Sequence, residues 1–211
     1  MKEELSPHLA QTIAYVKREL AQAEGGHDWY HVQRVWRLAR RIATAEKVET
    51  TVVDLGALLH DVADAKFHGG DETLGPRKAR QFLQSLAVAP EVVAHVVKII
   101  EQISFRKSGV GQTPFSREFA VVQDADRLDA MGAIGIARAF NYGGHKGRPL
   151  YVPAEEDPET APSATLQHFY DKLLLLKEGM HTATGQGLAA ERDRYMRAFL
   201  AQFYAEWEGN R

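Results

Sequence analysis

The sequence predicts an all-α protein, built as a single-domain helical bundle, and three observations support this. Apolar residues recur every three or four positions along most of the chain, as they do on one face of a helix. No alternating apolar and polar pattern of the kind typical of strands extends over more than a few residues. The chain has 211 residues, 45% of them hydrophobic and 26% charged, which is enough to bury one compact core. We therefore expect residues 1–211 to form one domain.

Capping residues and prolines indicate where the helices of the first half begin. Ser, Thr and Asp side chains accept hydrogen bonds from the first backbone N–H groups of a helix, and proline is favoured in the first turn. These signals occur at Ser6-Pro7, at Asp28, at Thr50 or Thr51, at Pro76 and at Pro90. Apolar residues that share one helical face follow each signal, so we expect a helix after each of them.

The second half combines further helix with one long irregular stretch. The helical pattern resumes at Glu118 and continues to Phe140. Residues 143–163 are rich in glycine and proline, and we expect an irregular loop of the kind that often covers a site. Residues 164–208 return to helical periodicity and should form the C-terminal helices.

The composition excludes several classes of protein. There are no cysteines, which rules out disulfide scaffolds and thiolate zinc sites and leaves His, Asp and Glu as the strong side-chain metal ligands. The net charge of -2 provides no positive electrostatic field that would attract nucleic acid non-specifically. No stretch approaches the ~18 apolar residues of a membrane helix, and the N-terminus lacks the apolar core of a signal peptide. We expect a cytoplasmic protein without nucleic-acid or membrane partners, and the sequence leaves its oligomeric state open.

Ionisable residues interrupt apolar helical positions at three separate places. His60 and Asp61 follow the apolar run in "LGALLHDVADAKFH", His31 begins another apolar stripe, and Asp126 lies within "AVVQDADRLDAMG". An unpaired polar group costs about 2–7 kcal/mol to bury, so each of these groups needs a partner. Taken singly, His31 is typical of a core or surface histidine and Asp126 of a carboxylate paired with Arg127. Three helices of a bundle that all point imidazole or carboxylate inward are instead typical of a bundle-core metal site.

The donor types restrict the ion that such a site would bind. Two imidazoles and two carboxylates suit a borderline-to-hard divalent ion, with Mn²⁺, Fe²⁺, Co²⁺, Ni²⁺, Zn²⁺ and Mg²⁺ as candidates. Neighbouring residues on a helix point about 100° apart, so His60 and Asp61 can share an ion only if it lies between their directions. Four protein ligands would leave one or two octahedral positions for water and a substrate oxygen, as catalysis requires.

Three segments resemble the HD-domain superfamily of metal-dependent phosphohydrolases, whose mark is His, then His-Asp, then Asp. The segments are "GHDWYHVQRVWRLA", "LGALLHDVAD" and "VVQDADRLDAMGAIGIARAF", and the resemblance covers about residues 27–144. It is strongest to the small stand-alone bacterial members that are similar to nucleoside-triphosphate pyrophosphohydrolases. The resemblance implies an HD-type helical bundle in which one divalent ion, expected to be Mn²⁺, is bound by His31, His60, Asp61 and Asp126.

Helical spacing places further residues near these ligands. Asp64 lies four residues after His60 and on the same face, where it could orient His60, act as general base on the attacking water, or be a solvated carboxylate. His27 lies one turn before His31 and could donate to a phosphoryl or leaving-group oxygen, or cap its helix. Arg34 lies one turn after His31 and could bind either a phosphate or an acidic neighbour.

Basic residues in the expected loops could bind the phosphates of a substrate; these are Lys66, Lys107, Lys146 and Arg148. Each alone is an ordinary exposed charge, but together they exceed what a phosphomonoester requires. With the resemblance, they predict a nucleotide substrate: a nucleoside or deoxynucleoside triphosphate, attacked at the α-phosphorus to give the monophosphate and pyrophosphate. The alternatives are a nucleoside monophosphate phosphatase and a catalytically silent, metal-containing nucleotide sensor.

Overall fold

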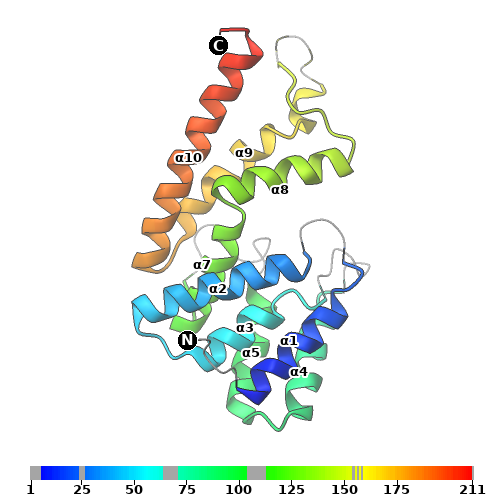
Figure 1. The fold of residues 1–211 in the computed structure, drawn as a ribbon, viewed down its shortest axis with the longest axis vertical. Coiled ribbons are helices and arrows are strands. Elements are labelled where there is room, and N and C mark those ends of the chain that lie inside the picture. The colour runs from blue at the N-terminus through cyan, green and yellow to red at the C-terminus, as the bar shows by residue number, and fades with distance from the viewer. Residues whose placement is uncertain are drawn as a thin grey trace.

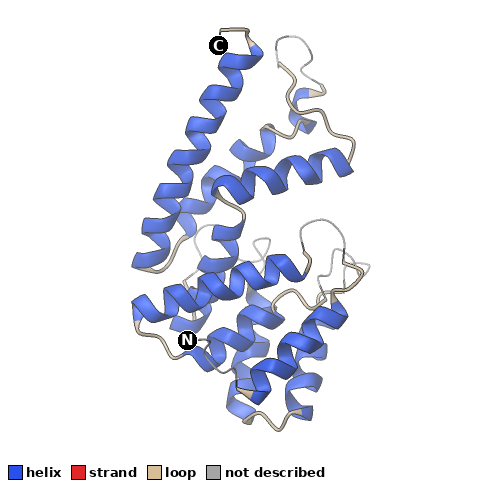
Figure 2. Ribbon diagram, in the orientation of Figure 1, coloured by secondary structure: helices blue, strands red, loops and turns tan. Residues whose placement is uncertain are grey.

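The computed structural model describes residues 6–23, 27–63, 71–103, 113–153, 155, 157 and 159–210. Over these ranges the only regular secondary structure is helical (Figure 2), which confirms the all-α prediction. The helices are α1 (Pro7–Glu19), α2 (Trp29–Glu46), α3 (Thr50–Leu59), α4 (Leu74–Ser85), α5 (Pro90–Gln102), α7 (Arg117–Asp129), α8 (Gly132–His145), α9 (Gln167–Asp171) and α10 (Ala183–Trp207), with 3₁₀ helices η2 (Ala161–Ser163) and η3 (Leu173–Gly179).

Helix α7 lies at the centre of an elongated molecule, between α1 to α5 below and α8 to α10 above (Figure 1). It packs against α2 and α3 on one side and against α10 on the other. All but one of its residues from Phe119 to Asp129 are buried, and the partly exposed one is Asp126. Polar residues on α7 therefore face other helices rather than bulk water, which is the arrangement that an interior site needs.

The predicted helix caps hold for α1 and α2 but not for α3. Ser6 and Asp28 are the N-caps of α1 and α2, and their side chains accept hydrogen bonds from backbone N–H groups in the first turn. The prediction that Thr50 or Thr51 caps α3 is wrong. Glu49 is the cap instead, because its longer side chain reaches back to accept from the N–H of Thr51 at 2.8 Å.

The single helix predicted from Glu118 to Phe140 is divided into α7 and α8. The chain turns at Gly132, whose φ of +68° lies in the left-handed region that favours glycine. A side chain there would also approach Cγ of Arg192 to 3.0 Å. The break matters for the site, because α8 runs sideways from the end of α7 (Figure 1) and its Arg138 reaches Asp129 on α7 at 2.6 Å.

Other boundaries differ from the predictions by a few residues. Helix α4 begins at Leu74, upstream of Pro76, because proline is tolerated anywhere in the first turn. Helix α8 continues to His145, so the irregular stretch expected at 143–163 begins later and contains η2 near its end. The helices expected within 164–208 are present, but the first is broken into α9 and the 3₁₀ helix η3.

The buried carboxylate of Asp124 attaches α10 to the central helix. Its Oδ1 accepts from the backbone N–H of His181 at 2.9 Å. Its Oδ2 accepts from the backbone N–H of Thr182 at 2.8 Å and from the hydroxyl of the same residue at 2.7 Å. Thr182 is the N-cap of α10, so one side chain of α7 satisfies the donors that precede this long helix.

We expect Asp124→Asn to lower the free energy of unfolding by about 1–3 kcal/mol, because an amide NH₂ replaces one acceptor and leaves a buried N–H group without a partner. Urea unfolding followed by circular dichroism measures the change. Asp171→Asn, on the exposed surface of α9, is the control and should shift stability by less than about 0.5 kcal/mol. Equal shifts in both variants would contradict this role for Asp124.

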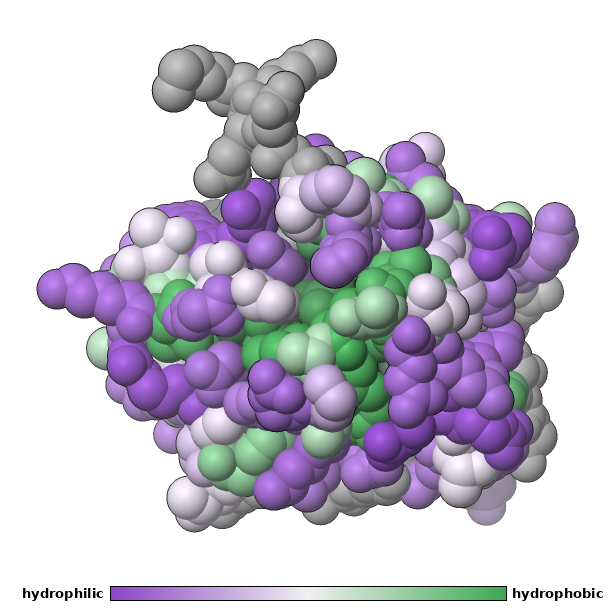
Figure 3. Space-filling view, turned by 90° about the horizontal axis from the view of Figure 1, so that it is seen from below, coloured by the Kyte–Doolittle hydropathy of each residue, from purple (hydrophilic) through white to green (hydrophobic). Residues whose placement is uncertain are grey.

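The end of the molecule opposite the C-terminus has an apolar area bordered by hydrophilic residues (Figure 3). Apolar atoms make up a large share of most protein surfaces, so an area of this kind does not by itself identify a function. Within the described ranges, none of the helices combines the length and the apolar character needed to span a membrane.

Candidate metal centre

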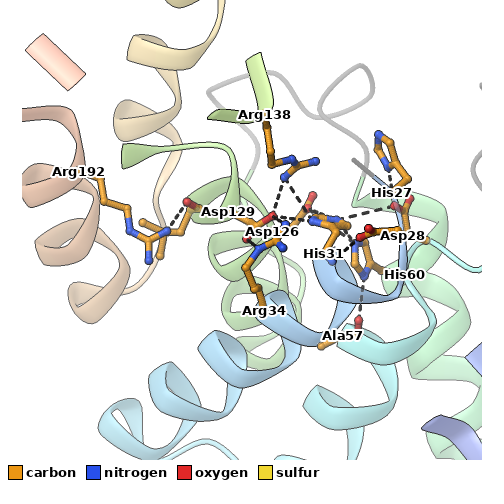
Figure 4. A network of polar contacts seen from close by, with 12 residues as sticks. His27, Asp28, His31, Arg34, Ala57, His60, Asp126, Asp129, Arg138 and Arg192 are labelled. Carbon is orange, nitrogen blue, oxygen red and sulfur yellow. Dashed lines mark hydrogen bonds and ion pairs between the residues drawn. The ribbon is translucent and has the colours of Figure 1, made fainter. Parts of the chain in front are cut away.

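Figure 4 shows His31, His60 and Asp126 close together where α2 begins, α3 ends and α7 passes beside them, and Asp61 follows His60 directly in the sequence. The Nε2 atoms of His31 and His60 lie 3.3 Å apart. Oδ1 of Asp126 lies 3.5 Å from Nε2 of His31 and 3.7 Å from Nε2 of His60. Oδ2 of Asp61 lies 3.8 Å from Nε2 of His31. The structure thus brings together the four residues that the sequence singled out as ligands.

The hydrogen bonds of the two imidazoles determine which ring nitrogens carry protons. Nδ1 of His60 lies 2.8 Å from the carbonyl oxygen of Ala57, which can only accept. Nδ1 of His31 lies 2.7 Å from Oδ2 of Asp129, which also accepts. In its neutral form each ring therefore carries its proton on Nδ1, and the two Nε2 atoms then present unshared electron pairs to each other across 3.3 Å.

Two facing electron pairs cannot form a hydrogen bond, and two nearby carboxylates add negative charge to the same space. A cation at the centre relieves both repulsions, and neutral imidazole with carboxylate is the donor set that divalent ions of the first transition row accept. His31, His60 and Asp126 each offer one ligand atom, all within 4.8 Å of one another. The residues present therefore fit a single divalent ion.

Burial sets the charge states that this arrangement needs. His31 is 1% exposed, and this burial lowers the pKa of its imidazole, which keeps the ring neutral and able to act as a ligand. Burial alone would raise the pKa of the Asp61 carboxyl, but the hydrogen bond from His27 and the nearby imidazoles hold that pKa well below its usual range. Asp61 is thus a carboxylate at neutral pH.

His27 is placed beside the cluster rather than at its centre. Its Nδ1 lies 2.5 Å from Oδ2 of Asp61, and together with His31 these residues form a second ligand-capable group. His31 offers only Nε2, because Nδ1 is bonded to Asp129. The two groups therefore describe overlapping parts of one site rather than two independent ion sites.

The sequence analysis missed Asp129 and Arg138. The carboxylate of Asp129 is 3% exposed and lies one turn after Asp126 on α7. It accepts from Nε of Arg34 at 2.7 Å and from Nη1 of Arg138 on α8 at 2.6 Å. Of the two partners considered for Arg34, the structure shows the acidic one, and that neighbour is Asp129. Its i+3 spacing from Asp126 was a signal that it shares the inward face.

The remaining predicted site residues are not brought to the cluster by the described part of the chain. Asp64, Lys66 and Lys107 lie outside the described residues. Lys146 and Arg148 follow α8, and their charged groups each lie 5.7 Å from the centre of the Tyr142 ring. Tyr142 lies one helical turn beyond Arg138 on α8, so both cations lie near the C-terminal part of this helix.

Comparison with known proteins agrees with this fold. The HD domain family model matches residues 28–131. The chain is 40% identical over 200 residues to the protein YpgQ of Bacillus subtilis, covering 94% of this chain and 93% of the relative. A crystal structure of an HD-superfamily hydrolase from Bacillus thuringiensis superposes with a TM-score of 0.77 at 41% identity, covering 95% of this chain and 96% of the other.

A further crystal structure shows Bacillus subtilis YpgQ in complex with ADP. It superposes with a TM-score of 0.75 at 34% identity, over 94% of this chain and 97% of that chain. These matches define the class of the protein: it has the fold of the HD-superfamily hydrolases. The chain belongs to the HD-domain superfamily, as the resemblance of its three segments implied, and is similar to YpgQ over nearly its whole length.

Proposed function

We propose that this protein is a divalent-metal-dependent phosphohydrolase that converts nucleoside or deoxynucleoside triphosphates to the monophosphate and pyrophosphate. One observation carries the proposal: the Nε2 atoms of His31 and His60 face each other at 3.3 Å, with the carboxylates of Asp61 and Asp126 beside them. His31, His60, Asp61 and Asp126 would hold one ion, with Mn²⁺ as the favoured metal. Asp126 has a side chain 33% exposed, so the site is open to solvent and to a substrate on that side.

A divalent ion bound there supplies a water of lowered pKa and a positive charge opposite the phosphoryl oxygens. The chain's own residues orient the reactants around it. Asp64 would accept the proton of the attacking water as a general base. His27 would donate a proton to the departing oxygen or to a phosphoryl oxygen, and its partly exposed side chain beside Asp61 supports this role.

The nucleotide as substrate is supported from two directions. A relative at 34% identity forms a complex with ADP, which makes a nucleoside with a phosphate chain the natural class to test. Cationic residues on α8 and directly after it also support the proposal: Arg138 lies within α8 beside Asp129, and Lys146 and Arg148 lie beside Tyr142 of the same helix. A phosphate chain longer than one unit would use several such charges.

Phosphorus NMR in water enriched in ¹⁸O tests the proposal. With Mn²⁺ and dATP, the protein should release dAMP and intact pyrophosphate, and the heavy oxygen should appear in dAMP because the α-phosphorus is attacked. Orthophosphate together with dADP would mean attack at the γ-phosphorus and would contradict the proposed reaction. Consumption of monophosphates alone would instead identify a nucleotidase, and no turnover of any nucleotide would favour a sensor.

Removing the two cations after α8 tests their part in substrate binding. Lys146→Gln combined with Arg148→Gln should raise KM several-fold more than it lowers kcat, if these charges bind the ground state and the transition state equally. The matched control neutralises Arg37 and Arg194, which are exposed on α2 and α10, and should leave KM unchanged. An unaltered KM in the first variant would show that residues 146–148 only connect helices.

A further inference from the structure

A buried carboxylate lies directly behind one of the candidate ligands. Asp129 is 3% exposed, and its Oδ2 lies 2.7 Å from Nδ1 of His31, on the opposite side of the ring from Nε2. The same carboxylate accepts from Arg34 through both oxygens, at 2.7 and 3.0 Å. Arg138 donates to Oδ2 at 2.6 Å. Three helices therefore meet at this one side chain (Figure 4).

We propose that Asp129 is a positioning residue that holds the proton of His31 on Nδ1, so that Nε2 is presented to the ion as an electron-pair donor. The inference rests on the proposed function and deepens it, since it assigns the residue that prepares one ligand of that site. Asp129 itself does not touch the ion in this assignment. It acts through the imidazole of His31.

The contacts of Oδ2 decide between the two possible tautomers of His31. If Nδ1 carried no proton, its electron pair would face a carboxylate oxygen at 2.7 Å, an arrangement in which both atoms repel. Nη1 of Arg138 lies 3.3 Å from the same Nδ1 but only 2.6 Å from Oδ2. The shorter contact shows that the arginine N–H donates to the carboxylate oxygen rather than to Nδ1, so Nδ1 of His31 is left to donate to the same oxygen.

The two arginines explain why a carboxylate can be kept ionised at this depth. An unpaired buried charge would be strongly destabilising, and burial by itself would raise the pKa of Asp129. The hydrogen bonds from His31 and Arg34 and the charge of Arg138 hold that pKa well below its usual range. The bidentate contact of Arg34 also fixes the orientation of the carboxylate plane.

A carboxylate fixed in this way has two consequences for the ligand. It holds the ring of His31 with Nε2 directed at the cluster, so the side chain loses less conformational entropy when an ion binds. Its negative charge also makes the far nitrogen more basic. His60 differs in this respect, because its Nδ1 donates to the uncharged carbonyl oxygen of Ala57, so the two imidazoles are not equivalent donors.

The tautomer can be measured on the unchanged protein without an ion. In protein labelled with ¹⁵N-histidine, long-range proton–nitrogen correlation spectra distinguish a proton on Nδ1 from one on Nε2, and the His31 signals are those that vanish in His31→Gln. We expect a protonated Nδ1. A proton on Nε2 would overturn the inference whether or not any variant folds.

Calorimetric titration with Mn²⁺ then measures the effect on the ion. Asp129→Asn should bind Mn²⁺ about 10- to 100-fold more weakly than the unchanged protein, the range typical of residues that orient a ligand. The control is Asp193→Asn, which removes another buried carboxylate that is paired with an arginine, Arg197 at 3.0 Å on α10. That control should bind as the unchanged protein does.

The same titration distinguishes a failure of the proposed function from a failure of the positioning role of Asp129. If the unchanged protein binds no divalent ion, the proposed function fails and the role of Asp129 fails with it. If the unchanged protein binds Mn²⁺ and Asp129→Asn binds it equally well, the metal centre stands and only the positioning role is wrong. Equal losses in the Asp129 and Asp193 variants would likewise overturn it, since they would reflect a general loss of structure.

Discussion

Replacing Asp126 by alanine should remove the bound ion and reduce nucleotide hydrolysis to background. Oδ1 of Asp126 lies 3.5 and 3.7 Å from the two facing Nε2 atoms, so its loss leaves the ion without a charged ligand on the open side. A direct ligand should contribute more than a residue that orients a ligand, so we expect an affinity loss larger than about 100-fold. Metal analysis of the purified variant and calorimetry with Mn²⁺ measure it.

This variant is favourable because the side chain of Asp126 is 33% exposed, so truncation leaves no large cavity. His60→Ala should lose the ion equally but also opens a void in the interior, since His60 is 8% exposed. Asp171→Ala, an exposed carboxylate on α9, is the control and should keep both ion and turnover. Full metal occupancy in a folded Asp126→Ala or His60→Ala protein would contradict the assignment of ligands.

Asp64→Asn should retain the ion but lose about 10²- to 10⁴-fold in kcat, the range expected when a general base is removed. The position is inferred from helical spacing, four residues after His60, and lies outside the described residues. The structure bears on one alternative: the Nδ1 proton of His60 is already directed to the carbonyl oxygen of Ala57 at 2.8 Å. An orienting partner for that ring is therefore in place, which favours the role of a base for Asp64.

The control for this variant is Glu72→Gln, an exposed carboxylate just after the undescribed residues 64–70. It should change kcat by less than twofold. Steady-state rates and metal content are measured on the same preparations, so that loss of the ion is not mistaken for loss of the base. Near-normal turnover in Asp64→Asn would make Asp64 a solvated carboxylate. Loss of the ion would make it a ligand.

The fold was predictable where local signals agree with one another. Asp28 followed by an apolar stripe correctly marked the start of α2, because capping and periodicity both act over a few residues. The division at Gly132 was not predicted, since the residues on both sides keep a helical pattern. Glycine is tolerated within helices, so Gly132 alone did not mark a break. Its positive φ and the nearby side chain of Arg192 on α10 are visible only in the folded chain.

The inward-facing residues of the candidate site could be predicted from the sequence, but their hydrogen-bond partners could not. His31, His60 and Asp126 stand out because each begins, follows or interrupts an apolar helical run. Their convergence needed the fold, since the contact between His31 and Asp129 joins positions 98 residues apart. Asp129 itself resembles an ordinary acid near a helix end until the fold places it beside two arginines.

The central claim is that His31, His60, Asp61 and Asp126 hold one divalent ion. Anomalous diffraction from a crystal grown with Mn²⁺, recorded on both sides of the manganese absorption edge, locates the ion directly. We expect one anomalous peak, between the Nε2 atoms of the two histidines and the oxygens of the two aspartates. The ion should lie about 2.0–2.3 Å from each of these four ligand atoms. A peak bound elsewhere, or no peak in a crystal whose protein carries manganese in solution, would contradict it.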